Sequence, residues 1–180
     1  MTKEMNILCA SDKNFLEPTY VTMWSVIKNH PGITINFYLF AGDDVDEQDK
    51  LQLQSFIESK GSSITYIDVD PEMYNDYVLC EKFPKAAYYR LMAHEYLPKT
   101  ADRVLYIDVD LIVDQNIYDD FYSMDFNDKY MVVTSHNPNP DYYNMLDSTI
   151  VNLESAAKGE FFNSGVLLMN LNKFRENITL

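Results

Sequence analysis

The sequence predicts an α/β fold in which helices cover both faces of a mostly parallel central sheet. Short apolar runs rich in Ile, Val, Tyr and Phe recur along the chain, and segments with helical periodicity lie between several of them. Strands that alternate with helices are typical of a parallel sheet, because a parallel connection needs a crossover segment. No low-complexity tract or Gly/Ser-rich linker divides the chain, so we expect residues 1–180 to form a single domain.

Six apolar runs are predicted to be the strands of this sheet. They are Met5–Ala10, Ile33–Ala41, Ser63–Val69, Arg103–Ile107, Tyr130–Thr134 and Gly165–Asn170. The run that ends at Ile107 is apolar at nearly every position, which is typical of a central strand buried on both faces. Parallel sheets bind their ligands beyond the carboxyl ends of the strands, so candidate functional residues are sought there.

Helical periodicity predicts three helices between the strands. They are Pro18–Asn29, Asp46–Lys60 and Lys85–Leu97. Gly61 is a stop signal for the second helix and Pro98 for the third. Near the end of the chain, Asn172 is predicted to cap a further helix over Lys173–Leu180.

The composition limits the partners and the location of the protein. The chain has 28 acidic and 14 basic residues and a formal net charge of −14, which opposes binding to nucleic-acid phosphates or to an anionic membrane. It contains no apolar run of about 18 residues and no signal-peptide pattern. We therefore expect no nucleic-acid partner, no membrane span and a cytoplasmic location, with peripheral attachment to the inner face of the membrane left open. Cys9 and Cys80 are interpreted as ordinary thiols.

Two carboxylates follow the most apolar of the predicted strands, in Asp108-Val109-Asp110. Residues i and i+2 of an extended chain point the same way, so both carboxylates are expected to face one site. At about 4 Å, two such charges repel by roughly 4 kcal/mol at an effective dielectric of about 20. A hard divalent cation such as Mn²⁺ or Mg²⁺ would offset this repulsion and would also bridge to an anionic diphosphate. The alternative is a pair of solvated carboxylates at a strand end.

The string Tyr-Ile-Asp-Val-Asp of this site also occurs at Tyr66–Asp70. There the preceding residues alternate like those of a more exposed strand, and Pro71 turns the chain. The surrounding sequence does not match over a full repeat, so Asp68 and Asp70 are interpreted as structural residues.

Four separated motifs, in order along the chain, resemble glycosyltransferase family 8, the family of glycogenin and of lipopolysaccharide galactosyl- and glucosyltransferases. The motifs are Cys9–Phe15, with Ser25 in the following helix, then Tyr88–Leu91, Val104–Asp110 and Phe162–Leu171. Each motif alone is weak evidence, whereas the four together cover essentially the whole chain. The resemblance implies a GT-A type nucleotide-diphospho-sugar transferase fold.

The resemblance also implies a nucleotide pocket. Ala10 and Asp12 would recognise uracil, with the Asp12 carboxylate accepting a hydrogen bond from the ring N–H. Asn14 and the main chain of Val109 would lie near the ribose. The alternative for Asp12 is a turn or cap residue.

A second group of residues is implied at the diphosphate and the sugar. Asp108 and Asp110 would hold the metal, and Arg90 would reach the diphosphate or the donor sugar. Asn163 and Ser164 would border the transferred sugar. The alternatives are a surface helix cation for Arg90 and a strand-entry residue for Asn163.

The activity implied is a retaining, metal-dependent transfer of a hexose from a uridine diphosphate sugar to an acceptor hydroxyl. The cofactor would be Mn²⁺ or Mg²⁺. The acceptor would be a glycan, lipopolysaccharide, a teichoic-acid-like polymer or a protein. Two alternatives remain: a fragment that binds uridine diphosphate and metal without turnover, and a haloacid-dehalogenase-type phosphatase, which also carries Asp-x-Asp after an apolar strand.

The sequence departs from the family near its end. The resemblance implies a later acidic, glutamine-containing motif at the sugar and a late histidine as the third metal ligand, and neither occurs here. We therefore interpret residues 1–180 as a family domain without its C-terminal part, with the catalytic group beyond residue 180 and Arg90 assisting. His136 is a weak candidate for a substitute ligand, and His30 and His94 are interpreted as helix-end or surface residues. An uncovered apolar surface would favour self-association.

Overall fold

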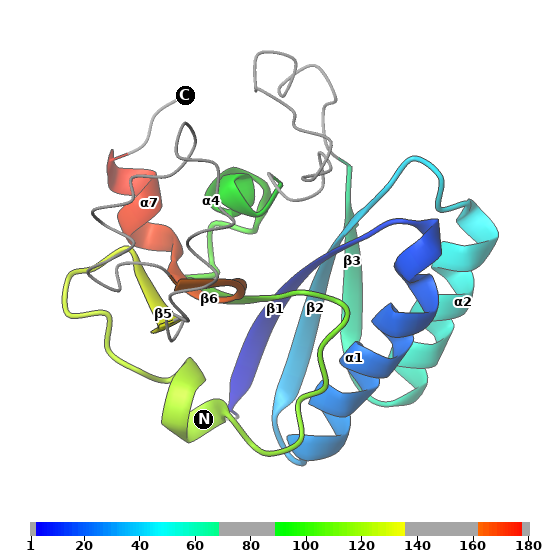
Figure 1. Cartoon of the computed structure of the whole chain (residues 1–180), viewed down its shortest axis with the longest axis horizontal. Helices are drawn as coiled ribbons and strands as arrows, with labels where there is room; N and C mark the ends of the chain where they lie inside the picture. Colours follow the sequence, from blue (N-terminus) through cyan, green and yellow to red (C-terminus); the bar gives the residue numbers. More distant parts are fainter. Residues whose placement is uncertain (1–2, 69–88, 136–161, 178–180) are drawn as a thin grey trace, which may run out of the picture.

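The computed structural model describes residues 3–68, 89–135 and 162–177 (Figure 1). It contains a six-stranded sheet with the order β3-β2-β1-β4-β6-β5. The strands are β1 (Glu4–Ser11), β2 (Thr34–Ala41), β3 (Ser63–Ile67), β4 (Arg103–Ile107), β5 (Met131–Ser135) and β6 (Phe162–Asn170). The first four pair in parallel, and β6 runs antiparallel to both of its neighbours. The predicted mostly parallel sheet is thus confirmed, with β4 in its interior.

Helices cover both faces of the sheet, as predicted (Figure 1). They are α1 (Leu16–Asn29), α2 (Glu47–Ser59), α4 (Ala93–Tyr96) and α7 (Leu171–Asn177). Met23 of α1 and Leu53 of α2 belong to the core on one face, and Ala93 and Leu171 belong to the core on the other. Successive strand residues alternate between these cores, because neighbouring side chains of a strand point to opposite faces.

The helix predicted over Lys85–Leu97 is divided in the part that the structure describes. Arg90–Met92 forms a 3₁₀ turn, and the short α4 follows it directly. The last predicted helix begins earlier than expected, and its cap is Asn170, whose side-chain oxygen accepts a hydrogen bond from the Lys173 N–H at 3.1 Å. Asn172 therefore lies inside the first turn of α7. No helix among the described residues is long and apolar enough to cross a membrane.

The helix-end position expected for His30 is confirmed, whereas His94 is not a surface residue. His30 ends α1 but is buried, with Nδ1 2.7 Å from the Val26 carbonyl oxygen and Nε2 accepting from the Ile117 N–H. His94 is also buried and stacks on Phe174 of α7, and burial lowers its pKa. Cys9 is a buried free thiol, in line with its structural interpretation. His136, Cys80, Val69 and Asp70 lie outside the described residues.

Candidate functional site

The carboxyl ends of the parallel strands meet the start of β6 at one edge of the sheet. Because β6 is antiparallel to β4, Ile107 at the end of β4 pairs with Val166 in the middle of β6. Just beyond this pair, the Asp108 N–H donates to the Gly165 carbonyl oxygen at 2.9 Å. The topology thereby brings the Asp-x-Asp segment against the segment 162–165, although more than 50 residues separate them in the chain.

Asp108 is held by two side chains at this edge. The Tyr106 hydroxyl donates to Asp108 Oδ1 at 2.6 Å, and an Arg90 guanidinium nitrogen lies 3.3 Å from the same oxygen. Arg90 also donates to the Ser164 carbonyl oxygen, and its guanidinium carbon lies 4.1 Å from the centre of the Tyr106 ring. Arg90 is therefore not a free surface cation, because it joins β4 to the start of β6.

Gly165 makes room for the Asp108 carboxylate. A Cβ placed on Gly165 would lie only 2.5 Å from Asp108 Oδ2 and 3.1 Å from Asn163 Oδ1. Asn163 Oδ1 accepts a hydrogen bond from the Gly165 N–H at 2.8 Å, while the Asn163 and Ser164 residues are exposed. A side chain at position 165 would thus occupy the space that Asp108 uses.

Tyr106 stays a hydrogen-bond donor under ordinary conditions. Its side chain is 1% exposed, and burial together with the neighbouring Asp108 carboxylate raises its pKa. A neutral phenol carries an O–H that can donate a hydrogen bond, and a carboxylate oxygen can accept it. The direction of the Tyr106–Asp108 hydrogen bond is therefore defined by the chemistry of the two groups.

Asp110 is not positioned by the strand alternation that we expected. β4 ends at Ile107, and Val109 and Asp110 form a turn. Val109 is buried, whereas Asp110 is exposed. The i, i+2 argument for an extended chain therefore does not apply to Asp108 and Asp110, and their approach to a common site depends on this turn.

Three polar side chains of α1, those of Thr22, Ser25 and Asn29, form hydrogen bonds with the backbone of residues 109–113. The Thr22 hydroxyl lies 2.7 Å from the carbonyl oxygens of both Val109 and Leu111. Ser25 Oγ accepts from the Val113 N–H at 2.9 Å, and the Asn29 side chain donates to the Val113 carbonyl oxygen at 2.7 Å. Thr22 and Asn29 have no predicted role in the sequence. Their signal is a row of polar residues at helical spacing, Thr22, Ser25 and Asn29, along α1.

Asp12 caps the 3₁₀ turn Lys13–Phe15 that links β1 to α1. Its Oδ1 accepts hydrogen bonds from the N–H groups of Asn14 at 2.9 Å and Phe15 at 3.1 Å. Oδ2 has no hydrogen-bond partner within the described ranges. Ala10, near the end of β1, is partly buried, Asn14 is exposed, and the Phe15 side chain is 45% exposed. The cap function considered for Asp12 is thus present, and it uses one of the two carboxylate oxygens.

The loop that carries Asp12 is bound to the loop that follows β2. The Gly42 N–H donates to the Ser11 carbonyl oxygen at 2.8 Å. Lys13 Nζ lies 3.0 Å from the Asp46 carboxylate and 3.2 Å from the Asp49 carboxylate. These contacts hold the Asp12 turn against the start of α2.

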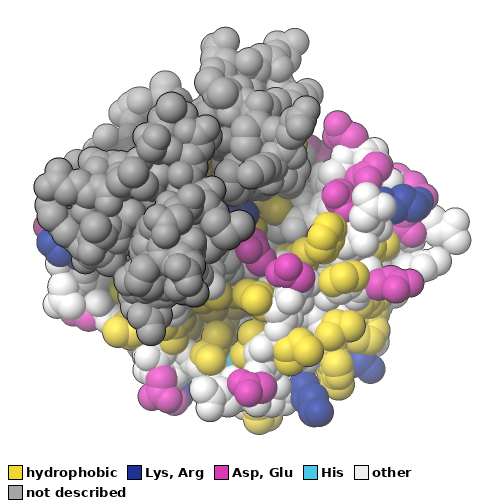
Figure 2. All heavy atoms as spheres, viewed as in Figure 1, with side chains coloured by type: hydrophobic (Ala, Val, Ile, Leu, Met, Phe, Trp, Pro, Cys, Tyr) yellow, Lys and Arg dark blue, Asp and Glu magenta, His cyan; other side chains and the backbone are white. Residues whose placement is uncertain are grey.

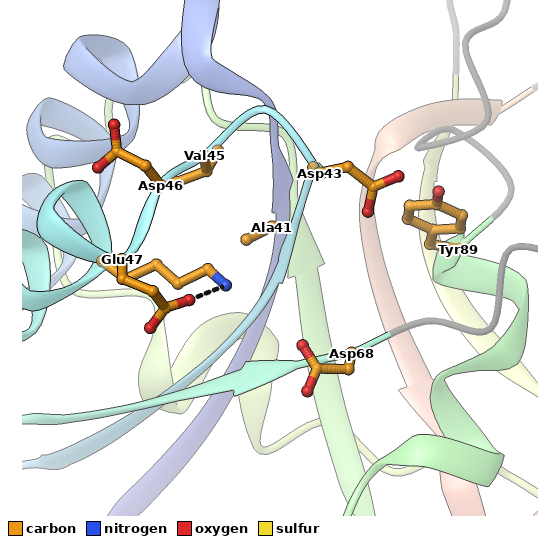
Figure 3. A pocket seen from close by; sticks show the side chains of 9 residues that line it. Ala41, Asp43, Val45, Asp46, Glu47, Asp68 and Tyr89 are labelled. Carbon is orange, nitrogen blue, oxygen red and sulfur yellow. Dashed lines mark hydrogen bonds and ion pairs between the residues drawn. The ribbon is translucent and has the colours of Figure 1, made fainter.

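A neighbouring cavity of about 470 Å³ lies beyond the ends of β2 and β3 (Figure 3). Among the described residues that line it, four are acidic, namely Asp43, Asp46, Glu47 and Asp68, and Lys50 is the cation. Figure 2 shows acidic side chains gathered over the start of α2. None of the predicted site residues lines this cavity, and the negative charge of its described lining is unsuited to an anionic diphosphate.

The carboxylates at the end of β4 offer a partial set of metal ligands. Asp108 Oδ2 lies over Gly165, away from the atoms that hold Oδ1, and Asp110 is exposed nearby in sequence. Carboxylate oxygens suit Mn²⁺ and Mg²⁺. No group of three or more His, Cys, Asp or Glu side chains that could hold a metal occurs within residues 3–68, 89–135 and 162–177. The donor set described is thus two carboxylates.

Comparison with known proteins gives a consistent set of relatives. The sequence pattern of glycosyl transferase family 8 matches residues 6–179. The lipopolysaccharide 1,2-glucosyltransferase of Escherichia coli K12 is 24% identical over 173 residues, which cover 96% of this chain and 49% of that protein. The lipopolysaccharide 1,3-galactosyltransferase of Salmonella typhimurium LT2 is 28% identical over 108 residues, which cover 60% of this chain and 32% of that protein. The chain spans about half the length of the curated relatives that it matches along nearly its whole length.

Solved structures share the fold. The galactosyltransferase LgtC, in complex with donor and acceptor sugar analogues, superposes with a TM-score of 0.75 at 25% identity and covers 97% of this chain, which corresponds to 60% of LgtC. The bifunctional glycosyltransferase WbbM superposes with a TM-score of 0.74 at 14% identity, over 98% of this chain and 33% of WbbM. The GT-A type fold expected from the sequence is therefore confirmed.

Proposed function

Because the chain belongs to glycosyltransferase family 8, we propose that it binds a uridine diphosphate hexose with a divalent cation and supports transfer of the hexose to an acceptor hydroxyl with retention of configuration. The observation that carries this proposal is the group of residues around Asp108. This carboxylate follows the end of β4 and lies beside Arg90 and against Gly165, where a side chain would not fit. The family match leaves the haloacid-dehalogenase alternative without support.

The nucleotide is proposed to bind at the Asp12 turn. Asp12 Oδ1 keeps its cap hydrogen bonds, so Oδ2 is the oxygen that would accept from the uracil N–H. The exposed Phe15 ring lies in the same turn and offers a flat apolar surface to a base. Ala10, Asn14 and the main chain of Val109 would complete the uridine pocket.

The diphosphate and the sugar are proposed to lie between Asp108, Arg90 and the start of β6. A bound Mn²⁺ or Mg²⁺, held by Asp108 and Asp110, would supply Lewis-acid stabilisation of the departing diphosphate. Arg90, held in place by Asp108 and Ser164, would add positive charge beside the leaving group. Asn163 and Ser164 are exposed at the same edge and would border the sugar.

The acceptor is proposed to be a glycan of the lipopolysaccharide type, because several relatives are named as lipopolysaccharide glucosyl- or galactosyltransferases. A cytoplasmic location with peripheral attachment at the inner membrane face is proposed on the same basis. These assignments are proposed for a whole glycosyltransferase, because the matched relatives are about twice as long as this chain.

A donor panel tests the proposed function. Calorimetric titration of the chain with UDP-glucose, UDP-galactose, CDP-glucose and GDP-mannose is expected to give binding only for the two UDP sugars, and only with Mn²⁺ or Mg²⁺. Release of free hexose from the bound donor would then separate a turning-over enzyme from a fragment that binds without turnover. Binding of none of the four sugars in the presence of Mn²⁺ would refute the proposed function.

Asp12→Asn is expected to abolish the preference for uridine over cytidine diphosphate. Asparagine keeps an oxygen for the cap and replaces the second oxygen by an N–H donor, which fits the acceptor nitrogen of cytosine rather than the N–H of uracil. A buried hydrogen-bonding group left without its partner costs about 1–3 kcal/mol, so the ratio of the two Kd values should change by roughly 5- to 150-fold. Competition between the two nucleotides measures this ratio directly.

Asp125→Asn is the matched control for this change. Asp125 Oδ1 also accepts a hydrogen bond from the backbone N–H two residues along the chain, that of Asn127, at 2.8 Å. The variant should therefore show a comparable effect on stability and leave the base preference unchanged. An unaltered preference in Asp12→Asn would remove Asp12 from the base pocket.

A further inference from the structure

Tyr106 contacts two of the charged side chains of the proposed diphosphate site, Asp108 and Arg90. Its hydroxyl donates to Asp108 Oδ1 at 2.6 Å, and its ring lies under the Arg90 guanidinium at 4.1 Å. The side chain is buried, with 1% exposed. A residue this deeply packed does not meet the donor itself, and its effect on the site must pass through Asp108 and Arg90.

These contacts distinguish the two carboxylate oxygens of Asp108. Oδ1 receives the Tyr106 hydroxyl and lies 3.3 Å from Arg90, whereas Oδ2 faces the gap above Gly165. An O–H group that donates to a carboxylate at this distance forms a strong, charge-assisted hydrogen bond. Rotation of the carboxylate would break that bond, so Oδ2 is kept as the oxygen available to a cation.

We propose that Tyr106 is a positioning residue for metal binding, which fixes the Asp108 carboxylate through Oδ1 and presents Oδ2 to the divalent cation. This inference rests on the proposed function, because it requires Asp108 to be a metal ligand. Hydrogen-bond partners of metal ligands set the orientation of those ligands, and their loss typically lowers metal affinity about 10- to 100-fold. Tyr106 would belong to this class of residue.

Tyr106→Phe tests the proposal, since it removes the hydroxyl and keeps the ring that fills the core and lies under Arg90. Mn²⁺ binding to the chain with UDP is followed by electron paramagnetic resonance, which reports free and bound Mn²⁺ separately. We expect the Kd for Mn²⁺ to rise at least about tenfold, with an altered spectrum of the bound ion. Thermal unfolding without metal checks that the variant is folded.

Tyr122→Phe is the matched control. Its hydroxyl is also buried and accepts a hydrogen bond from the Asn6 N–H at 2.9 Å, near the amino end of β1 and away from Asp108. We expect this variant to bind Mn²⁺ like the wild type and to give the same spectrum, even where its melting temperature falls. Equal loss of Mn²⁺ affinity in both variants would indicate general destabilisation and overturn the positioning role.

Asp108→Asn separates failure of this inference from failure of the proposed function. If Mn²⁺ binding depends on Asp108 but Tyr106→Phe has wild-type affinity and spectrum, the positioning role is overturned and the proposed function stands. If the wild type binds no Mn²⁺, or Asp108→Asn binds it equally well, the metal site itself is wrong and both fall.

Discussion

Asp108→Asn is expected to remove the metal dependence of uridine diphosphate binding. The substitution keeps the shape of the side chain and an oxygen for the Tyr106 hydroxyl, and it removes the charge that we propose to face the cation. Two unit charges at about 4 Å attract by roughly 4 kcal/mol at an effective dielectric of about 20, which corresponds to nearly a thousandfold in affinity. Calorimetry with and without Mn²⁺ should therefore give the same weak affinity for this variant, and Asp110→Asn should behave in the same direction.

Asp68→Asn is a control of the same local sequence. Asp68 follows Tyr66 and Ile67 as Asp108 follows Tyr106 and Ile107, but it lies at the end of β3, three strands away from β4 in the sheet. At about 4.8 Å per strand this places it roughly 14 Å from the proposed metal. The Asp68→Asn variant should retain metal-dependent binding of uridine diphosphate. Loss of that dependence in Asp68→Asn, or its survival in Asp108→Asn, would contradict the assignment of the metal site.

The strands of the sheet were predictable because burial on both faces leaves a direct trace in the sequence. β1, β2 and β4 are apolar runs and occur within about one residue of the predicted bounds. The orientation of β6 was not predictable, since an apolar run does not reveal the direction in which it pairs. Its start, from Phe162 to Ser164, extends the strand before the apolar run and is recognised only from pairing with β5.

The buried face of α1 shows why some site residues were missed. Apolar periodicity predicted the helix, yet Val21 and Trp24 are 53% and 39% exposed, whereas Thr22 and Ser25 are buried. The segment after Asp110 runs beside α1 without belonging to a strand or helix. Its backbone N–H and C=O groups need partners, and the helix supplies them from hydroxyl and amide side chains. The backbone groups that need these partners lie almost 90 residues away in the chain. The local sequence of the helix therefore does not reveal why its hydroxyl and amide side chains are buried.

The candidate site was predicted as a list of residues, and the structure adds the contacts between them. Asp108, Arg90 and Ser164 are joined directly. Asp108 follows β4 and Ser164 lies near the start of β6, whereas Arg90 comes from the predicted helix Lys85–Leu97. The arrangement of these side chains depends on Tyr106 and Gly165. In the sequence, these two residues look like an ordinary core tyrosine and a strand glycine. Their importance arises from packing between β4 and β6, which no single segment encodes.

Gly165→Ala is expected to weaken metal-dependent donor binding severely while the sheet remains folded. The added methyl group would lie 2.5 Å from Asp108 Oδ2 and 3.1 Å from Asp108 Cγ, well inside contact distance. Asp108 cannot simply turn away, because Oδ1 is bound to Tyr106 and its backbone N–H to the Gly165 carbonyl oxygen. The carboxylate must therefore shift, and a displacement of about 1 Å at such a group can cost about a hundredfold. Calorimetric titration with UDP and Mn²⁺ measures this loss.

Gly32→Ala separates this local displacement from a general loss of stability. Gly32 lies in the turn before β2, at the opposite end of the parallel strands, and its φ of +79° is unfavourable for alanine although no atom lies within 4 Å of the added Cβ. It should lower the melting temperature because of backbone strain, by an amount corresponding to about 1 kcal/mol, and leave Mn²⁺-dependent binding intact. Gly165→Ala should show the reverse pattern, since its backbone needs no left-handed conformation and its conflict is with Asp108. Wild-type metal affinity in Gly165→Ala would mean that Asp108 adjusts freely, and that the gap above Gly165 is not what places its carboxylate.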